Sequence, residues 1–291
     1  MKNVKYIKGI QNIIDSYEIF ILDQWGVMHD GKAGYSHAIK CINYIKSRNK
    51  KLIIISNSSK RKKDSIARLP SLGFSTNFFE EVQTSGEMVW QAIALSLQKY
   101  GKNLKKCFYM FDESDENQSI YIKGLDHVEF VKNISEADFI LACTPYANFQ
   151  PIDYIPLLEK ACEKNVLMFC ANPDFETVEK DSKNIYCMGT IAQLYENMGG
   201  KIVILGKPNK HIYEEATKKL SNFPKNKMIA VGDSIFHDIK GANNFGIDSV
   251  LITSGIHSKY FSKNQPSWQD NANKLIKHNI IPTYIAYNFA F

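Results

Sequence analysis

Two aspartates stand directly after apolar runs that lie far apart in the sequence. Asp23 follows the run 19–22, and Asp233 follows the run 228–231 and Gly232. If both runs are strands of one parallel sheet, their carboxyl ends meet at one edge and bring the carboxylates together. Two adjacent carboxylates repel each other unless a cation lies between them, and Mg²⁺ combines a few carboxylates with waters and phosphate oxygens. The pattern therefore predicts Asp23 and Asp233 as Mg²⁺ ligands.

Two other apolar runs end in groups that complement these carboxylates. On its own, either Asp23 or Asp233 would equally fit the N-cap of the helix that follows its strand. Ser56, however, offers a hydroxyl and a series of backbone N–H groups near a helix N-terminus, which is an anion site. Lys207 adds a positive charge on a loop that Pro208 stiffens. A carboxylate nucleophile, a hydroxyl, a lysine and a metal carboxylate at one edge predict phosphoryl transfer through an aspartyl-phosphate.

The elements that must position these groups follow from the alternation of apolar runs and helical segments. This alternation is typical of βαβ units and a parallel sheet buried on both faces. The runs expected in that sheet are residues 19–22, 52–55, 202–205, 228–231 and 249–252. The spacing predicts a helix over residues 4–14, and the apolar tail 284–291 is either a last strand against the core or a subunit interface.

The middle of the chain has a different pattern and predicts a second domain. Its segments, including 107–111, 120–122 and 128–131, are shorter and more aromatic, as in strands exposed on one face. We therefore predict a Rossmann-like parallel α/β core formed by residues 1–85 and 200–291, interrupted by an inserted α/β domain over residues 86–199.

Composition narrows the class of protein. The chain has 291 residues, 44% of them hydrophobic, and a formal charge of +6. Only three basic residues are Arg, whereas nucleic-acid readout relies on the guanidinium fork, so we expect no nucleic-acid partner and interpret the basic run 60–63 as a solvated face. The six cysteines form no metal or disulfide pattern. With no signal peptide or long apolar stretch, we expect a cytoplasmic protein without a membrane partner.

Four short motifs resemble those of the haloacid dehalogenase-like (HAD) hydrolases, in the order of that family. They lie at residues 23–27, 56–57, 206–208 and 232–238. The insertion between the second and third motifs resembles the class IIA branch, which carries a C2-type cap and includes 4-nitrophenylphosphatases and sugar-phosphate phosphatases. Residues 84–86 and 172–174 support that branch. The resemblance implies a HAD core with an inserted C2-type cap.

The resemblance also implies a role for each matching residue. Asp23 would be the nucleophile and a Mg²⁺ ligand, together with Asp233. Ser56 and Lys207 would hold the transferring phosphoryl group. The other implied site residues are Trp25, whose backbone carbonyl would bind the metal; Asp238, which would support the metal or the lysine; Asn57 and Ser58, which would contact phosphate; and Asn172 and Asp174, which would face the substrate.

One position departs from the phosphatase pattern. That family has a second Asp two residues after the nucleophile, where it protonates the leaving group and activates water, and this chain has Trp25 instead. An indole cannot shuttle a proton, and such a group contributes roughly 10²- to 10⁴-fold to the rate. We therefore expect weak turnover of esters with poor leaving groups, unless His29, Asp30 or His237 replaces the missing acid.

The same departure leaves three hypotheses open. The leading one is a Mg²⁺-dependent phosphatase that acts on a small phosphorylated metabolite, such as a sugar phosphate, a nucleotide or an aryl phosphate. The second is a metal-independent carbon–halogen hydrolase, since haloacid dehalogenases also carry an aromatic residue at this place. The complete metal motif around Asp233 weakens that reading. The third is a non-catalytic phosphometabolite-binding protein. The sequence leaves the oligomeric state open, a homo-oligomer included.

Overall fold

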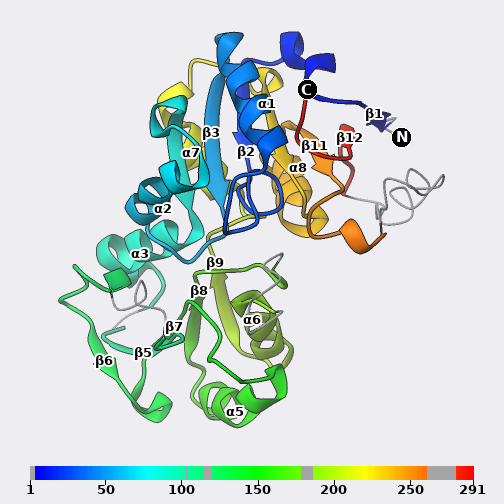
Figure 1. Ribbon diagram of the computed structural model, residues 1–291. Helices are drawn as coiled ribbons and strands as arrows, with labels where there is room; N and C mark the ends of the chain where they lie inside the picture. The colour runs from blue at the N-terminus through cyan, green and yellow to red at the C-terminus, as the bar shows by residue number, and fades with distance from the viewer. Residues whose placement is uncertain (1–3, 102–103, 115–119, 178–185, 261–279) are drawn as a thin grey trace. The chain divides into compact units, whose positions relative to one another are not determined.

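The computed structural model describes residues 4–101, 104–114, 120–177, 186–260 and 280–291 (Figure 1). It divides into two compact units. The first contains Met1–Ser56, Ser65–Gln83 and Lys207–Phe291, and the second contains Asn57–Asp64 and Thr84–Gly206. Each unit has its own sheet, and every strand pair with an assigned direction is parallel. The predicted fold class, a parallel α/β core with an inserted α/β part, is confirmed.

The sheet of the first unit has seven strands in the order β1-β12-β11-β10-β2-β3-β4. Their bounds are β1 Lys5–Tyr6, β2 Ile19–Leu22, β3 Lys51–Ser56, β4 Phe79–Thr84, β10 Met228–Gly232, β11 Asp248–Ile252 and β12 Tyr284–Ala286. The chain moves outward from β2 to β3 in one direction and from β10 to β12 in the other. The neighbours β2 and β10 therefore form the topological switch point, where α/β sheets bind their ligands beyond the carboxyl ends of the strands.

The central strands are apolar because both faces of the sheet are covered. All four residues of β2 and all five of β10 are buried. Among the described residues, the α-helices of this unit are α1 Ser36–Ser47, α7 Lys210–Thr217 and α8 Lys240–Phe245, and α2 Lys62–Arg68 begins in the second unit and ends in the first. Apolar side chains spaced three and four residues apart give α1 its buried stripe of Ala38, Cys41, Ile42 and Ile45.

The sheet of the second unit has five strands in the order β6-β5-β7-β8-β9. Their bounds are β5 Lys106–Met110, β6 Glu129–Val131, β7 Phe139–Ala142, β8 Leu167–Cys170 and β9 Lys201–Ile204, and the helices of the unit include α3 Ser85–Ser96, α5 Ile155–Glu163 and α6 Met188–Asn197. Alternate residues of β7 enter two different core clusters, with Phe139 in one and Ile140 in the other. Both faces of this sheet are therefore buried.

Three sequence expectations about the elements are wrong. The run 202–205 was expected in the core sheet, but β9 pairs with β8 in the second sheet. Residues 120–121 are helical instead of extended, and the first residues form β1 and two short 3₁₀ helices instead of one helix. In each case a short apolar run is compatible with more than one kind of element or with more than one sheet. The segment that it packs against in the fold determines which of them forms.

The tail prediction has a clear outcome. Strand β12 lies between β11 and β1, so the last residues extend the core sheet and bring the two ends of the chain together (Figure 1). Of the two roles expected for the apolar tail, the strand against the core is confirmed.

Candidate active site

The carboxyl edge of the first sheet carries the residues that the sequence singled out. Asp23 follows β2, Asp233 follows β10, and Ser56 is the last residue of β3. Leu22 lies opposite Val231, and the backbone N–H of Asp23 donates to the carbonyl of Val231 at 2.9 Å. Because the two strands are neighbours in register, their following aspartates lie at the switch point.

Lys207 contacts two of the three acidic side chains at this edge. Its Nζ lies 2.6 Å from Oδ1 of Asp23 and 2.6 Å from Oδ1 of Asp238, and only 3% of its side chain is exposed. The other oxygen of Asp238 accepts the backbone N–H of Ser234 at 3.1 Å. This second bond orients the Asp238 carboxylate, which in turn fixes the ammonium group against the predicted nucleophile.

Asp233 is enclosed by backbone. Its Oδ2 accepts the N–H of Ile256 at 2.7 Å. A Cβ added to Gly26 or Gly255 would lie 1.9 Å or 2.0 Å from the same oxygen, so only glycine fits at either position. Burial, together with the charges of Asp23 and Asp238, raises the pKa of Asp233 well above its usual value.

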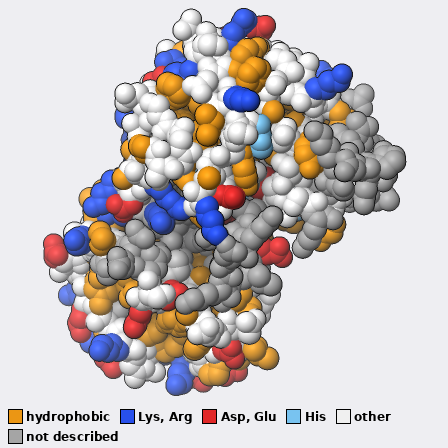
Figure 2. Space-filling model, in the orientation of Figure 1, with side chains coloured by type: hydrophobic (Ala, Val, Ile, Leu, Met, Phe, Trp, Pro, Cys, Tyr) orange, Lys and Arg blue, Asp and Glu red, His pale blue; other side chains and the backbone are white. Residues whose placement is uncertain are grey.

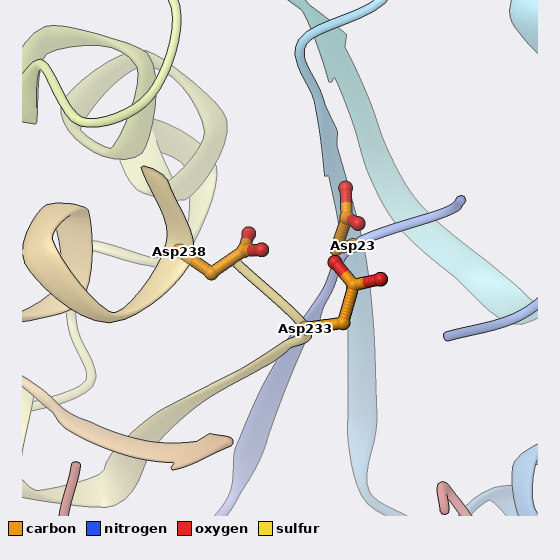
Figure 3. A group of neighbouring side chains, drawn as sticks. All are labelled: Asp23, Asp233 and Asp238. Atoms are coloured by element: carbon orange, nitrogen blue, oxygen red, sulfur yellow. The ribbon is translucent and has the colours of Figure 1, made fainter. Parts of the chain in front are cut away.

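The cluster fits a divalent cation. Oxygens of Asp23, Asp233 and Asp238 lie within 4.8 Å of one another, and their carboxylates come together from the end of β2 and from the segment that follows β10 (Figure 3). Three buried carboxylates beside one lysine leave negative charge uncompensated, and this charge adds to the effect of burial in raising the pKa of Asp233. The donors are hard oxygens, the type that Mg²⁺ and Ca²⁺ prefer. A cation here would allow all three groups to ionise.

Four predicted substrate contacts lie in the second unit. Asn57 donates from Nδ2 to Oδ1 of Asp174 at 2.8 Å, and the backbone N–H of Asp174 donates to Oδ1 of Asn172 at 3.3 Å. The hydroxyl of Ser58 accepts the N–H of Lys60 at 3.2 Å. The structure thus joins Asn57, Asn172 and Asp174 in one hydrogen-bonded group. Their contact with a substrate stays a prediction.

Trp25 packs into the loop that follows the nucleophile. Its ring lies 5.1 Å from the His29 ring in an edge-on arrangement, and the guanidinium of Arg68 lies 5.8 Å from its centroid. Gly31 has φ +93°, and a Cβ there would lie 2.3 Å from the indole. The neighbouring Gln24 accepts the hydroxyl of Ser65 at 3.2 Å. Helix α2 thus contacts this loop through Ser65 and Arg68.

The three candidate replacements for the missing acid all have local structural partners. His29 is buried, and its Nδ1 accepts the N–H of Gly31 at 3.1 Å; burial, and then the charge of Arg68, lower its pKa to about 4. Asp30 accepts two backbone N–H groups of its own turn, and these bonds lower its pKa. The Nδ1 of His237 lies 3.1 Å from the hydroxyl of Ser234.

One cluster has no signal in the local sequence pattern, and it lies in the basic run that we interpreted as a solvated face. Arg61 binds Glu87 through two bonds of 2.7 Å and 3.2 Å and lies 3.6 Å from the centroid of the Trp90 ring. Only 13% of the Arg61 side chain is exposed. Burial opposes the ionisation of Glu87, but the bonds from Arg61 and Lys62 outweigh it and lower its pKa. For Arg61 the solvated interpretation is wrong.

Fold and site together define a class of protein: a parallel α/β hydrolase with an acidic and lysine-containing centre at the switch point. Two family models match the chain, a haloacid dehalogenase-like hydrolase model over residues 20–118 and a HAD-hydrolase-like model over residues 204–288. These segments contain both metal-motif aspartates and Lys207. The chain belongs to the haloacid dehalogenase-like hydrolases.

Comparison with individual proteins agrees with this family. A haloacid dehalogenase-like hydrolase from Brucella suis has a TM-score of 0.81 at 26% identity, covering 98% of this chain and 100% of that one. The 4-nitrophenylphosphatase of Thermotoga maritima has a TM-score of 0.66 at 22% identity, covering 95% and 96%. Chloroplastic phosphoglycolate phosphatase 1A of Arabidopsis thaliana is 23% identical over 270 residues, which are 87% of this chain and 73% of the relative.

Within the part of the chain that the structure describes, every helix is too short or too polar to span a bilayer. On the face in Figure 2, Lys and Arg side chains occur on both units among acidic and uncharged ones.

Proposed function

We propose that this protein is a Mg²⁺-dependent phosphomonoesterase that transfers the phosphoryl group of a small phosphorylated metabolite to Asp23 and then to water. One observation carries the proposal: the Nζ of Lys207 lies 2.6 Å from both Asp23 and Asp238, beside the buried Asp233. A positive charge next to the nucleophile is placed where negative charge develops on the phosphoryl oxygens.

The residues of the first unit suit the two steps of such a reaction. A carboxylate oxygen of Asp23 attacks phosphorus, and the bond from phosphorus to the ester oxygen breaks. Lys207 and the hydroxyl of Ser56 hold the phosphoryl oxygens, while Asp238 keeps the lysine in place. Water then attacks the same phosphorus and releases Asp23. Bound by Asp23, Asp233 and the carbonyl of Trp25, Mg²⁺ would neutralise phosphoryl oxygens and orient the phosphorus.

The proposal extends to the second unit. Residues 86–199 are the C2-type cap in this proposal, and Asn57, Ser58, Asn172 and Asp174 supply contacts to the substrate. The bond between Asn57 and Asp174 supports a common role, because within the second unit it joins the motif 56–57 to the motif 172–174.

The carbon–halogen alternative is not favoured. Its argument was the aromatic residue at position 25, but Trp25 packs against Gly31 and His29. A metal-free reaction would also not explain why three carboxylates lie together, and two of the three proteins compared above carry phosphatase names. The non-catalytic binding protein has no observation of its own in its favour, and it becomes an outcome of the test.

The test measures the hydrolysis of 4-nitrophenyl phosphate by the unaltered protein with Mg²⁺ and with EDTA, and by the Asp23→Asn variant with Mg²⁺. We expect Mg²⁺-dependent release of phosphate that EDTA and the substitution both abolish. Asp23→Asn retains size and shape, so an unchanged thermal unfolding profile would show that the loss is chemical. Absence of Mg²⁺-dependent turnover in the unaltered protein would refute the proposal. Stabilisation by phosphate without turnover would instead favour a binding protein.

A further inference from the structure

The side chain of Trp25 is a structural part of the loop 26–34. Its six-membered ring lies against the Cα of Gly31, where an added Cβ would come within 2.3 Å and 2.4 Å of two ring carbons. The ring of His29 contacts it from another side, at 5.1 Å. Arg68 faces the indole and also donates a hydrogen bond to the carbonyl of Gly31. These contacts account for its half-buried state.

This packing fixes what position 25 can contribute to the reaction. The indole has one N–H donor, no acceptor, and no proton that it can exchange near neutral pH. The contacts with Gly31, His29 and Arg68 hold the ring in one place in the loop. No other rotamer of the side chain would supply an acid or a base either, because the indole has no such group. The side chain of Trp25 therefore takes no part in proton transfer, although it lies two residues from the nucleophile.

We propose that the preferred substrates are phosphorylated compounds whose leaving oxygen departs as a stable anion: aryl, enol and acyl phosphates and phosphoanhydrides. Simple alkyl phosphates are poor substrates. This inference rests on the proposed function and narrows its substrate class. When Asp23 attacks, the bond between phosphorus and the leaving oxygen breaks, and its electron pair stays on that oxygen. Without a proton from position 25, the barrier rises with the basicity of the leaving group.

The second step has a different requirement. Water attacks the phosphorus of the aspartyl-phosphate, the bond to the Asp23 oxygen breaks, and the carboxylate leaves without needing a proton. The attacking water must lose a proton, which passes to the solvent because position 25 holds no base. This step is the same for every substrate, so we expect it to limit kcat for substrates with good leaving groups, whose first step is fast. The aspartyl-phosphate then accumulates during turnover, and its formation is reported by kcat/KM.

The experiment compares 4-nitrophenyl phosphate, phenyl phosphate and phosphoglycolate, an alkyl phosphate, with Mg²⁺. We expect kcat/KM to fall by at least about 10²-fold from the first to the last, which is the lower bound for a lost general acid. We also expect a rapid first release of 4-nitrophenol, close to one equivalent of enzyme, before the steady rate. Mass spectrometry of the quenched reaction would show one phosphoryl group on the protein.

Two variants test the role of position 25. Trp25→Asp supplies a carboxyl group and should raise kcat/KM for phosphoglycolate by about 10²- to 10⁴-fold more than for 4-nitrophenyl phosphate. Trp25→Phe keeps an aromatic ring against Gly31 and should retain the steep dependence on the leaving group. The unaltered protein tests the inference even if Trp25→Asp does not fold.

The outcomes separate this inference from the proposed function. Equal kcat/KM for phosphoglycolate and 4-nitrophenyl phosphate would overturn the inference, because another group would then protonate the leaving oxygen, and the phosphatase would remain. Failure to hydrolyse even 4-nitrophenyl phosphate, with no phosphoryl group on the protein, would overturn the proposed function itself.

Discussion

The buried imidazole of His29 makes the first unit sensitive to acid. His29 is 2% exposed, its Nδ1 accepts the N–H of Gly31, and its ring contacts Trp25. Burial, and then the charge of Arg68, lower its pKa from 6.5 to about 4. In the unfolded chain His29 takes up a proton near pH 6.5, while in the folded protein it stays neutral until about pH 4.

The sign and size of the effect follow from these two pKa values. Between pH 6.5 and pH 4 the unfolded chain binds more protons, so the free energy of unfolding falls as the pH falls. Above pH 6.5 the group is neutral in both states and causes no loss. The full difference corresponds to about 3 kcal/mol, reached below pH 4, and about 2 kcal/mol of it is lost by pH 5.

The matched substitution is His29→Asn, because the amide Oδ1 can accept the N–H of Gly31 without titrating. Urea denaturation at pH 7 and pH 5 with EDTA gives the free energy of unfolding of each protein. We expect the unaltered protein to lose about 2 kcal/mol more than the variant between these values. The comparison cancels other titrating groups, Asp233 included. His211→Asn, at an exposed position of α7, should retain the pH dependence of the unaltered protein.

The result that would refute this reasoning is a parallel pH dependence of the unaltered protein and His29→Asn. Such a result would mean that His29 titrates at the same pH in the folded and unfolded states. The burial of the imidazole and the nearby charge of Arg68 would then not determine its protonation.

Three further predictions concern the contacts of the site and of the second unit. Removing Mg²⁺ with EDTA should lower thermal stability in the unaltered protein more than in Asp233→Asn, measured by calorimetry, because the variant lacks one carboxylate that a cation would neutralise. Asp238→Asn should lower kcat/KM by about 10- to 100-fold, since Lys207 loses a charged hydrogen-bond partner; an unchanged value would contradict this role. Arg61→Met should cost about 3 to 5 kcal/mol in urea denaturation by leaving the buried Glu87 without its oppositely charged partner, and Glu87→Leu in the same chain should recover part of it.

The site geometry was predictable where strand order determined it. Asp23 and Asp233 follow buried apolar runs, and parallel strands present their carboxyl ends at one edge, so a shared sheet was sufficient to bring the two residues together. The same reasoning failed for β9. The predicted run 202–205 is as apolar as the core strands, but composition does not specify which of two sheets a strand joins, and β9 pairs with β8.

Side-chain environments inside loops were not predictable from the sequence. The basic run 60–63 has the composition of an exposed surface, yet Arg61 lies on the ring of Trp90 and binds Glu87. Glu87 is 26 residues further along, and nothing in the local pattern links it to Arg61. Likewise, the sequence identified Trp25 as unusual, but its packing against Gly31 depends on a loop conformation that periodicity does not encode.

In this site the lysine proposed to bind the phosphate is held by carboxylates and not by the residue at the position expected for proton transfer. The contacts of Lys207 with Asp23 and Asp238, and the enclosure of Asp233 by Gly26 and Gly255, involve no atom of the Trp25 side chain. Inorganic phosphate should therefore inhibit the unaltered protein, Trp25→Phe and Trp25→Asp with inhibition constants that differ far less than their rates on phosphoglycolate. A loss of phosphate affinity as large as the change in rate would show that position 25 shapes the anion site, and the separation of phosphate binding from proton transfer would then be wrong.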